Sequence, residues 1–118
     1  MEQKAETLRQ QKVGAQIQRD LSEIFQREYT GVAHGVVLSV TKVRVSSDLT
    51  SARVYLSVFP FAKAEGVLKK VKEAASGVRG ALGRRIRHQL RVVPELHFYI
   101  DDSMEYVENI ERLIEGDL

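Results

Sequence analysis

Residues 63–91 read KAEGVLKKVKEAASGVRGALGRRIRHQLR. Nine of these residues are Lys or Arg and only Glu65 and Glu73 are acidic, so the segment has a net charge of +7. The spacing of its apolar residues predicts two helices, over about 62–75 and 78–90, with a break or kink at Gly77. A strongly basic face on a rigid helical element is typical of a surface that binds a polyanion.

The second of these helices combines cationic side chains with glycines. Its residues at i, i+3, i+4 and i+7 are Arg84, Arg87, His88 and Arg91, which places them on one face. Gly77, Gly80 and Gly83 lead onto that face, although glycine costs a helix interior about 1 kcal/mol relative to alanine. We interpret the combination as a site where arginines hold an RNA phosphate chain close to the backbone. A solvated face whose glycines permit helix–helix contact is the alternative.

Other charged residues of this segment are assigned different roles. Lys69, Lys70 and Lys72 lie on the outer side of the first helix, where they would steer RNA toward the site or only keep the protein soluble. The buried side of the second helix is expected to comprise Val78, Ala81, Leu82, Ile86 and Gln89. Arg85 lies at the edge of this apolar side, so we interpret it as structural.

Hydrophobic periodicity predicts the remaining elements. A helix is expected over 5–28, strands over 36–45, 51–58 and 95–100, a hairpin turn over 46–50, and a final helix after Asp102-Ser103-Met104-Glu105, which resembles a capping box. In the first strand the valine pattern slips by one residue near Val40-Thr41, which predicts a bulge or bend there, or a first half buried on both faces. The final helix has an apolar stripe that we expect to dock on the domain.

This order of elements predicts a two-layer α+β domain. Its sheet is a three-stranded mixed one, because a strand–helix–helix–strand crossover is normally right-handed and lays its helices on one sheet face. The second sheet face would present Lys42, Arg44, Arg53, Tyr55, His97 and Tyr99. Basic side chains interleaved with aromatic ones can hold single-stranded RNA, so Lys42, Arg44 and Arg53 form a possible secondary RNA site. We favour the alternative that this second sheet face is partly exposed to solvent, or that the acidic final helix covers it.

Composition excludes several classes of function. The 118 residues include no cysteine, so disulfides and thiolate metal sites are excluded. His34, His88 and His97 are scattered, and no nucleophile elbow, Walker A or dinucleotide motif is present, so we expect no metal site, no cofactor and no enzyme activity. No secretion signal and no apolar run of about 20 residues is visible, so we expect a cytoplasmic protein without a membrane segment. The net charge of +2 hides a basic middle and an acidic C-terminus.

Several stretches, taken in order, resemble the bacterial ribosome-binding factor A family. These are Gln11-Lys12-Val13-Gly14 through Glu23-Ile24, Val43 to Leu49 followed by Ala52 to Ser57, Ala75-Ser76-Gly77, and Arg91-Val92-Val93-Pro94-Glu95-Leu96. The resemblance implies a type-II KH-like fold in which an Ala-x-Gly kink replaces the Gly-x-x-G loop of ordinary KH domains. It also implies a non-enzymatic factor that binds the immature small ribosomal subunit. Thr30-Gly31-Val32-Ala33 stands where many members carry Asp-Pro-Arg.

The leading hypothesis is therefore an assembly factor needed for late maturation of the 30S subunit and for 16S rRNA processing. It would bind free immature subunits, as a monomer and without a small-molecule substrate, through residues 1–100, with 101–118 as an acidic helix packed on or flexibly attached to the domain. The predicted RNA-binding residues are Lys69, Lys70, Lys72, Ala75, Ser76, Gly77, Arg79, Gly80, Arg84, Arg87, His88 and Arg91. The alternatives are a KH-like regulator of another RNA, or a protein-interaction module that docks through its acidic helix.

Overall fold

The computed structural model describes residues 5–116 and confirms the α+β architecture. Helix α1 (Leu8–Arg27) leads through a short 3-10 helix, η1 (Thr30–Ala33), to strands β1 (Val37–Val45) and β2 (Ser51–Phe59). After a second 3-10 helix, η2 (Phe61–Lys63), come α2 (Ala64–Glu73), α3 (Ala75–Ile86), β3 (Glu95–Ile100) and α4 (Ser103–Gly116). The three strands form one mixed sheet in the order β1-β2-β3, with β2 antiparallel to β1 and parallel to β3. No described helix is long and apolar enough to cross a membrane.

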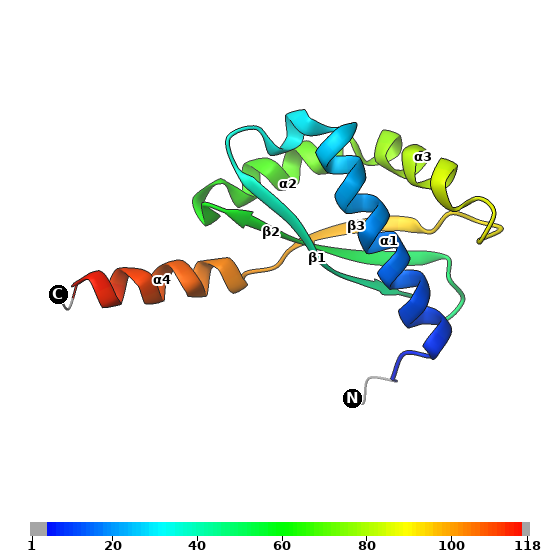
Figure 1. The fold of residues 1–118 in the computed structure, drawn as a ribbon, viewed down its shortest axis with the longest axis horizontal. Helices are drawn as coiled ribbons and strands as arrows, with labels where there is room; N and C mark the ends of the chain where they lie inside the picture. The colour runs from blue at the N-terminus through cyan, green and yellow to red at the C-terminus, as the bar shows by residue number, and fades with distance from the viewer. Residues whose placement is uncertain (1–4, 117–118) are drawn as a thin grey trace.

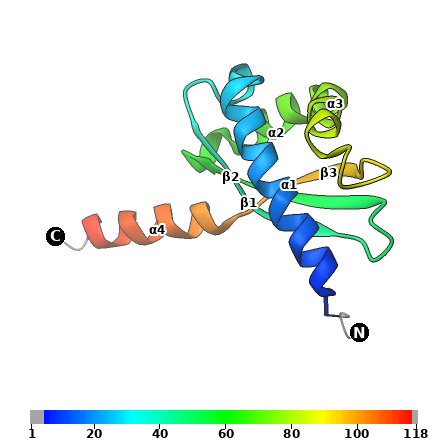
Figure 2. The same ribbon diagram turned by 45° about the vertical axis from the view of Figure 1, so that its right-hand side comes forward.

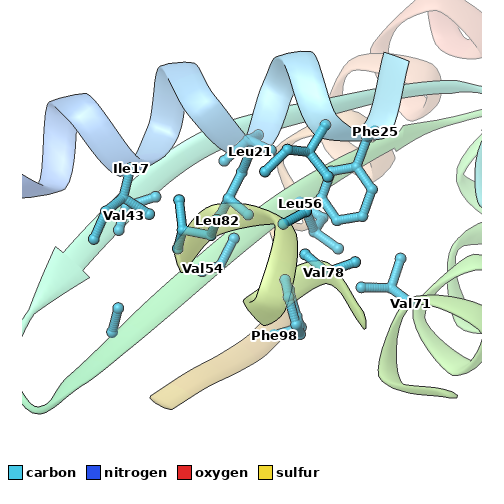
Figure 3. Close-up of a cluster of buried hydrophobic side chains, with 14 of the residues drawn as sticks. Ile17, Leu21, Phe25, Val43, Val54, Leu56, Val71, Val78, Leu82 and Phe98 are labelled. Atoms are coloured by element: carbon cyan, nitrogen blue, oxygen red, sulfur yellow. The ribbon is translucent and has the colours of Figure 1, made fainter. Parts of the chain in front are cut away.

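The core lies between the sheet and the layer formed by α1, α2 and α3, which cover one sheet face (Figure 1). Ile17, Leu21 and Phe25 reach down from α1, while Val54, Leu56 and Phe98 reach up from the strands (Figure 3). Val71 of α2 and Val78 and Leu82 of α3 fill the space between them. Burying each such side chain stabilises the fold by roughly 1.5–3 kcal/mol, so this cluster fixes where the helices lie on the sheet.

The predicted bulge in the first strand is confirmed, and it determines which side chains face the core. The register with β2 shifts between Val40 and Lys42, so Thr41 is the extra residue. Val40, Val43 and Val45 are consequently all buried, although their spacing is not that of a regular strand. Gln18 of α1 donates from Nε2 to the carbonyl oxygens of Val40 (3.0 Å) and Thr41 (3.3 Å), which secures the bulge.

Helix α1 lies close against β1 because glycine occupies the crossing point. A β-carbon at Gly14 would approach the carbonyl oxygen of Val43 to 2.8 Å. One turn earlier, Gln10 donates from Nε2 to the carbonyl oxygen of Val45 at 3.0 Å, and it also completes a capping box with Thr7. The helix therefore begins at Leu8 rather than at residue 5, because Thr7 satisfies its first free N–H groups.

Helix α4 does not pack as expected. It leads away from the end of β3 (Figure 2), and its main contacts with the domain are with β2 and η2. The backbone N–H of Phe61 in η2 donates to Oε1 of Glu108. Its apolar stripe is largely exposed, with Val107 at 44%, Ile110 at 36% and Ile114 at 58%. The expectation that the whole stripe docks on the domain is wrong, because the turn at Asp101 and Asp102 directs the helix outward. Asp101 rather than Asp102 accepts hydrogen bonds from the N–H and hydroxyl groups of Ser103.

Candidate nucleic-acid interface

The predicted bend between the two helices α2 and α3 is confirmed, but it is centred on Ala74 rather than on Gly77. Ala74 has φ −89° and ψ 0°, its N–H bonds to the carbonyl oxygens of Lys70 and Val71, and its own carbonyl receives the N–H of Val78. Gly77 lies within α3 and has no positive φ, which among the described glycines is found only at Gly35. No side chain caps the first turn of α3. An uncapped helix start presents N–H groups and the positive end of the helix dipole, which favour a bound anion.

The surroundings of the three glycines in α3 differ, so glycine is not needed at all three positions for the same reason. A β-carbon at Gly77 would overlap the hydroxyl of Tyr29, and one at Gly83 would lie 3.0 Å from Cγ2 of Val93. Both positions are therefore small because the domain packs against them. At Gly80 a β-carbon would meet only the Nη1 atom of Arg84, at 3.8 Å. Gly80 is thus the one glycine of α3 where the backbone is open to an approaching ligand.

Gly80 lies in a groove of about 600 Å³ between α3 and the segment that enters β3. Ala75, Ser76 and Gly83 line the helix side of the groove, with Arg79 at its edge, and Val93, Glu95 and Leu96 line the opposite side. Its floor of small and apolar groups begins beside the uncapped start of α3. Such a groove can admit a nucleotide chain with its phosphates near the helix start and its bases against the apolar wall.

Arg79 builds the groove wall rather than projecting freely from the helix. Its guanidinium donates from Nη2 to the carbonyl oxygen of Val93 at 2.6 Å and from Nε to that of Pro94 at 3.2 Å. These bonds hold the entry to β3 against α3. The sequence also predicts that Arg79 contacts RNA, and this contact stays a prediction.

The arginine row does not form one helical face, because α3 ends at Ile86. Arg84 lies in its last turn, Arg87 and His88 lie in the following turn, and Arg91 lies in the loop. The predicted helix over 78–90 is therefore too long, and Gln89 is exposed while Leu90 takes the buried position expected for it. All four residues of the row remain exposed. Arg84, 70% exposed, makes one long contact of 3.8 Å with Glu28, which leaves its charge available.

The lysines of α2 extend the positive surface away from the groove. Lys69, Lys70 and Lys72 are exposed, and no carboxylate of the described residues lies within 4.0 Å of them. They do not line the groove. Their position and free charge fit long-range attraction of phosphate better than a close contact.

Arg85 is structural, as its place at the edge of the apolar side predicts. Its side chain is 27% exposed and contacts Glu23 at 2.5 Å, Asp20 at 3.8 Å and Glu28 at 3.7 Å. The hydrogen bond from Arg85 lowers the pKa of Glu23, and the same bond raises the pKa of Arg85. This network ties α3 to α1 and so fixes the position of the groove.

The open face of the sheet carries the second predicted group of cations. Lys42, Arg44 and Arg53 are exposed there, next to Tyr55, His97 and Tyr99. The suggestion that the acidic final helix covers this face is wrong, since α4 leads away from it (Figure 1). Sequence reasoning also missed Val93 and Leu96 as groove walls, because only the fold brings the entry of β3 beside α3.

The family model and the similar proteins found by comparison point to the same family. The family model for ribosome-binding factor A matches residues 9–114. The ribosome-binding factor A of Christiangramia forsetii is 44% identical over 112 residues, which are 94% of this chain and 86% of that protein. That of Flavobacterium psychrophilum is 48% identical over 113 residues, with the same shares.

Solved structures resemble the fold as well. The crystal structure of ribosome-binding factor A from Thermus thermophilus has a TM-score of 0.66 at 30% identity, covering 77% of this chain and 94% of that one. A homology model of the Thermus thermophilus factor, fitted into a cryo-EM map of its complex with the 30S subunit, has a TM-score of 0.61 at 31% identity, with shares of 75% and 91%. These likenesses agree with the KH-like fold that the sequence implies.

Proposed function

This chain belongs to the ribosome-binding factor A family, and we propose that it is an assembly factor that binds the small ribosomal subunit. It acts in the cytoplasm, as a monomer and without catalysing a reaction, on free immature 30S particles during late maturation and 16S rRNA processing. The Thermus thermophilus relative forms a complex with the 30S subunit, which supports this partner.

The observation that carries the proposal is the groove beside Gly80. It joins the uncapped start of α3 to an apolar wall, and the exposed Lys69, Lys70 and Lys72 lie on the preceding helix. We propose that 16S rRNA enters this groove with its phosphates toward the first turn of α3 and that Arg84, Arg87 and Arg91 hold the continuing backbone. Arg79 shapes the groove, and His88 adds a contact when RNA passes the turn after α3.

Sedimentation with purified particles tests this proposal. The protein should travel with immature small subunits and much less with whole ribosomes, and the logarithm of its affinity should fall linearly with the logarithm of salt concentration. Changing Arg84, Arg87 and Arg91 together to Glu should nearly abolish binding. The matched control changes three exposed cations on other elements, Arg9, Lys12 and Arg112, to Glu and alters net charge equally. Equal binding by the two triple variants would contradict the proposal.

A second candidate function follows from α4. Its exposed Tyr106, Leu113 and Ile114 lie on a helix rich in Glu, which is suited to docking a partner that has an apolar groove with basic edges. In this case the partner is a protein, and binding to particles would resist ribonuclease but require residues 103–116. Truncation after Ser103, combined with ribonuclease treatment, separates the two candidates.

A further inference from the structure

The sheet has one face that no helix covers. The helices α1, α2 and α3 lie on the other face (Figure 2). Strand residues such as Val54, Leu56 and Val58, which point toward these helices, are fully buried, whereas the residues that alternate with them are not. An uncovered sheet face is usually a plain polar surface. This one instead presents aromatic and cationic side chains in two adjacent rows.

The register places these side chains directly beside one another. In one row Lys42 pairs with Tyr55, and Tyr55 pairs with Tyr99. In the next row, two residues along each strand, Arg44 pairs with Arg53, and Arg53 pairs with His97. The two rows contain three permanent cations, two aromatic rings and one histidine, and no carboxylate.

The bulge at Thr41 produces this arrangement. It shifts the phase of β1, so that Val43 and Val45 enter the core while Lys42 and Arg44 point to the open face. Thr41 also donates its hydroxyl to Oδ2 of Asp101 at 2.9 Å, which links the bulge to the end of β3. The same bulge that completes the core therefore places Lys42 beside Tyr55 and Arg44 beside Arg53 on the open face.

The aromatic pair is available for stacking. The rings of Tyr55 and Tyr99 stack on each other with centroids 5.6 Å apart and an interplanar angle of 29°. Tyr99 is 44% exposed, so part of its surface remains open to another planar group. A hollow of about 660 Å³ extends from Tyr55 past Lys42, Arg44 and Arg53 to Glu6 at the edge.

The acidic groups near this face lie at its borders. Glu6 contacts Arg44 at 3.5 Å, and Glu95 contacts His97 at 3.8 Å, both distances of weak surface pairs. Asp101 is occupied by Thr41 and Ser103. Within the described part of the chain, no carboxylate lies within 4.0 Å of Lys42 or Arg53. The centre of the face is therefore positive, and two of its cations are unpaired.

We propose that this face is a second RNA-binding site, which takes a single strand by stacking a base on Tyr99 and holding phosphates with Lys42, Arg44 and Arg53. Stacked bases on aromatic rings beside a cationic track are the general mode of sequence-tolerant single-strand binding. A duplex keeps its bases stacked inside and cannot use Tyr99. The site lies opposite the helix layer, so the inference goes beyond the proposed use of the groove at Gly80.

Binding of a fluorescent single-stranded RNA dodecamer to the full chain tests the site. Tyr99→Ser should weaken binding roughly 5- to 150-fold, the equivalent of one lost base stack, and Tyr99→Phe should retain it. The matched control is Tyr106→Ser, which removes an exposed tyrosine from α4. Arg53→Gln should also lower the slope of log affinity against log salt by about 0.7, whereas Arg19→Gln on α1 should not.

The chain also provides a direct spectroscopic readout. It contains four tyrosines and no tryptophan, so a base that stacks on Tyr99 should quench tyrosine emission, and Tyr99→Phe should remove most of that quenching. The proposal is overturned if Tyr99→Ser and Tyr106→Ser bind equally, if the matching RNA duplex binds as tightly as the single strand, or if a polyglutamate peptide displaces the RNA at equal charge concentration. Sedimentation with immature subunits tests the groove proposal separately. In that assay the variant changed at Arg84, Arg87 and Arg91 should lose subunit binding whether or not Tyr99 is present.

Discussion

The hydroxyl of Tyr29 occupies the space that a side chain at position 77 would need. Tyr29 follows the end of α1, and Gly77 lies in the first turns of α3, so a contact between residues far apart in sequence dictates glycine there. The Ala75-Ser76-Gly77 stretch is thus a packing contact as well as the start of the basic helix. Packing rather than a break in the helix therefore requires glycine here, since α3 runs through Gly77.

Replacing Gly77 by Ala should destabilise the protein by about 1–2 kcal/mol, because the new methyl group displaces Tyr29. In a Tyr29→Ala background the sign should reverse, since alanine then gains up to about 1 kcal/mol of helix propensity with nothing to displace. Urea unfolding followed by circular dichroism measures both values. Identical changes in the two backgrounds would show that Tyr29 does not constrain this position.

Gly80→Ala should separate stability from binding. Its methyl group meets only Arg84, so the helix should gain up to about 1 kcal/mol in unfolding free energy. The same methyl group narrows the groove, so affinity for immature small subunits should fall, and Gly80→Leu should reduce it further. Gly66→Ala on α2 is the control, because a β-carbon there meets no atom within 4 Å and Gly66 does not line the groove. A Gly80→Leu variant that binds normally would show that RNA does not approach the α3 backbone here.

Arg79 and Arg84 should respond in opposite ways. Arg79→Ala removes charged hydrogen bonds to the carbonyl oxygens of Val93 and Pro94, and should lower the unfolding free energy by about 1–2 kcal/mol. Arg84→Ala breaks only a long, exposed contact and should leave stability within about 0.5 kcal/mol while weakening subunit binding. Thermal unfolding and sedimentation are measured on both variants. If the Arg79→Ala protein is as stable as the unmodified protein, the structural role of Arg79 is refuted.

Local patterns were sufficient wherever a local cause determines the structure. The phase slip in β1 predicts the bulge because an extra residue places Val40, Val43 and Val45 on the same buried face. The alternation in β2 predicts its buried face for the same reason. The family resemblance then identifies the α2–α3 region as the candidate site.

Distant contacts explain what the sequence left undetermined. A glycine-rich helix start does not reveal which glycine faces Tyr29, which faces Val93 and which faces a groove. The end of α3 at Ile86 depends on Leu90 entering the core, and a helical projection of the sequence favours Gln89 instead. The apolar stripe of α4 indicates amphipathicity but cannot show whether a surface of the same chain receives it.

Acid should weaken the β1–β2 hairpin through Asp48. Its carboxylate accepts hydrogen bonds from the Thr50 hydroxyl at 2.7 Å, the Ser46 hydroxyl at 2.8 Å and the Thr50 N–H at 3.1 Å, and the Thr50 hydroxyl contributes most to lowering the pKa of Asp48. A lowered folded-state pKa means that the stabilisation is complete above the unfolded value of about 3.9 and is lost as pH falls through the folded value.

Asp48→Asn should therefore flatten the dependence of unfolding free energy on pH below about 4, measured by urea unfolding at successive pH values. Asp102→Asn, which removes an exposed carboxylate outside the hairpin, is the control. If both variants retain the pH dependence of the unmodified protein, the hairpin carboxylate is not its source.

Removing α4 should cost little stability. Truncation after Ser103 deletes a largely exposed helix whose main contacts with the domain are with β2 and η2, so the unfolding free energy should fall by less than about 2 kcal/mol. Most of that loss should be reproduced by Glu108→Ala, which removes the acceptor of the Phe61 N–H. The truncation also deletes five acids and one base, so RNA affinity should stay equal or rise. A loss of several kcal/mol in urea unfolding would instead mean that α4 folds back onto the domain in solution.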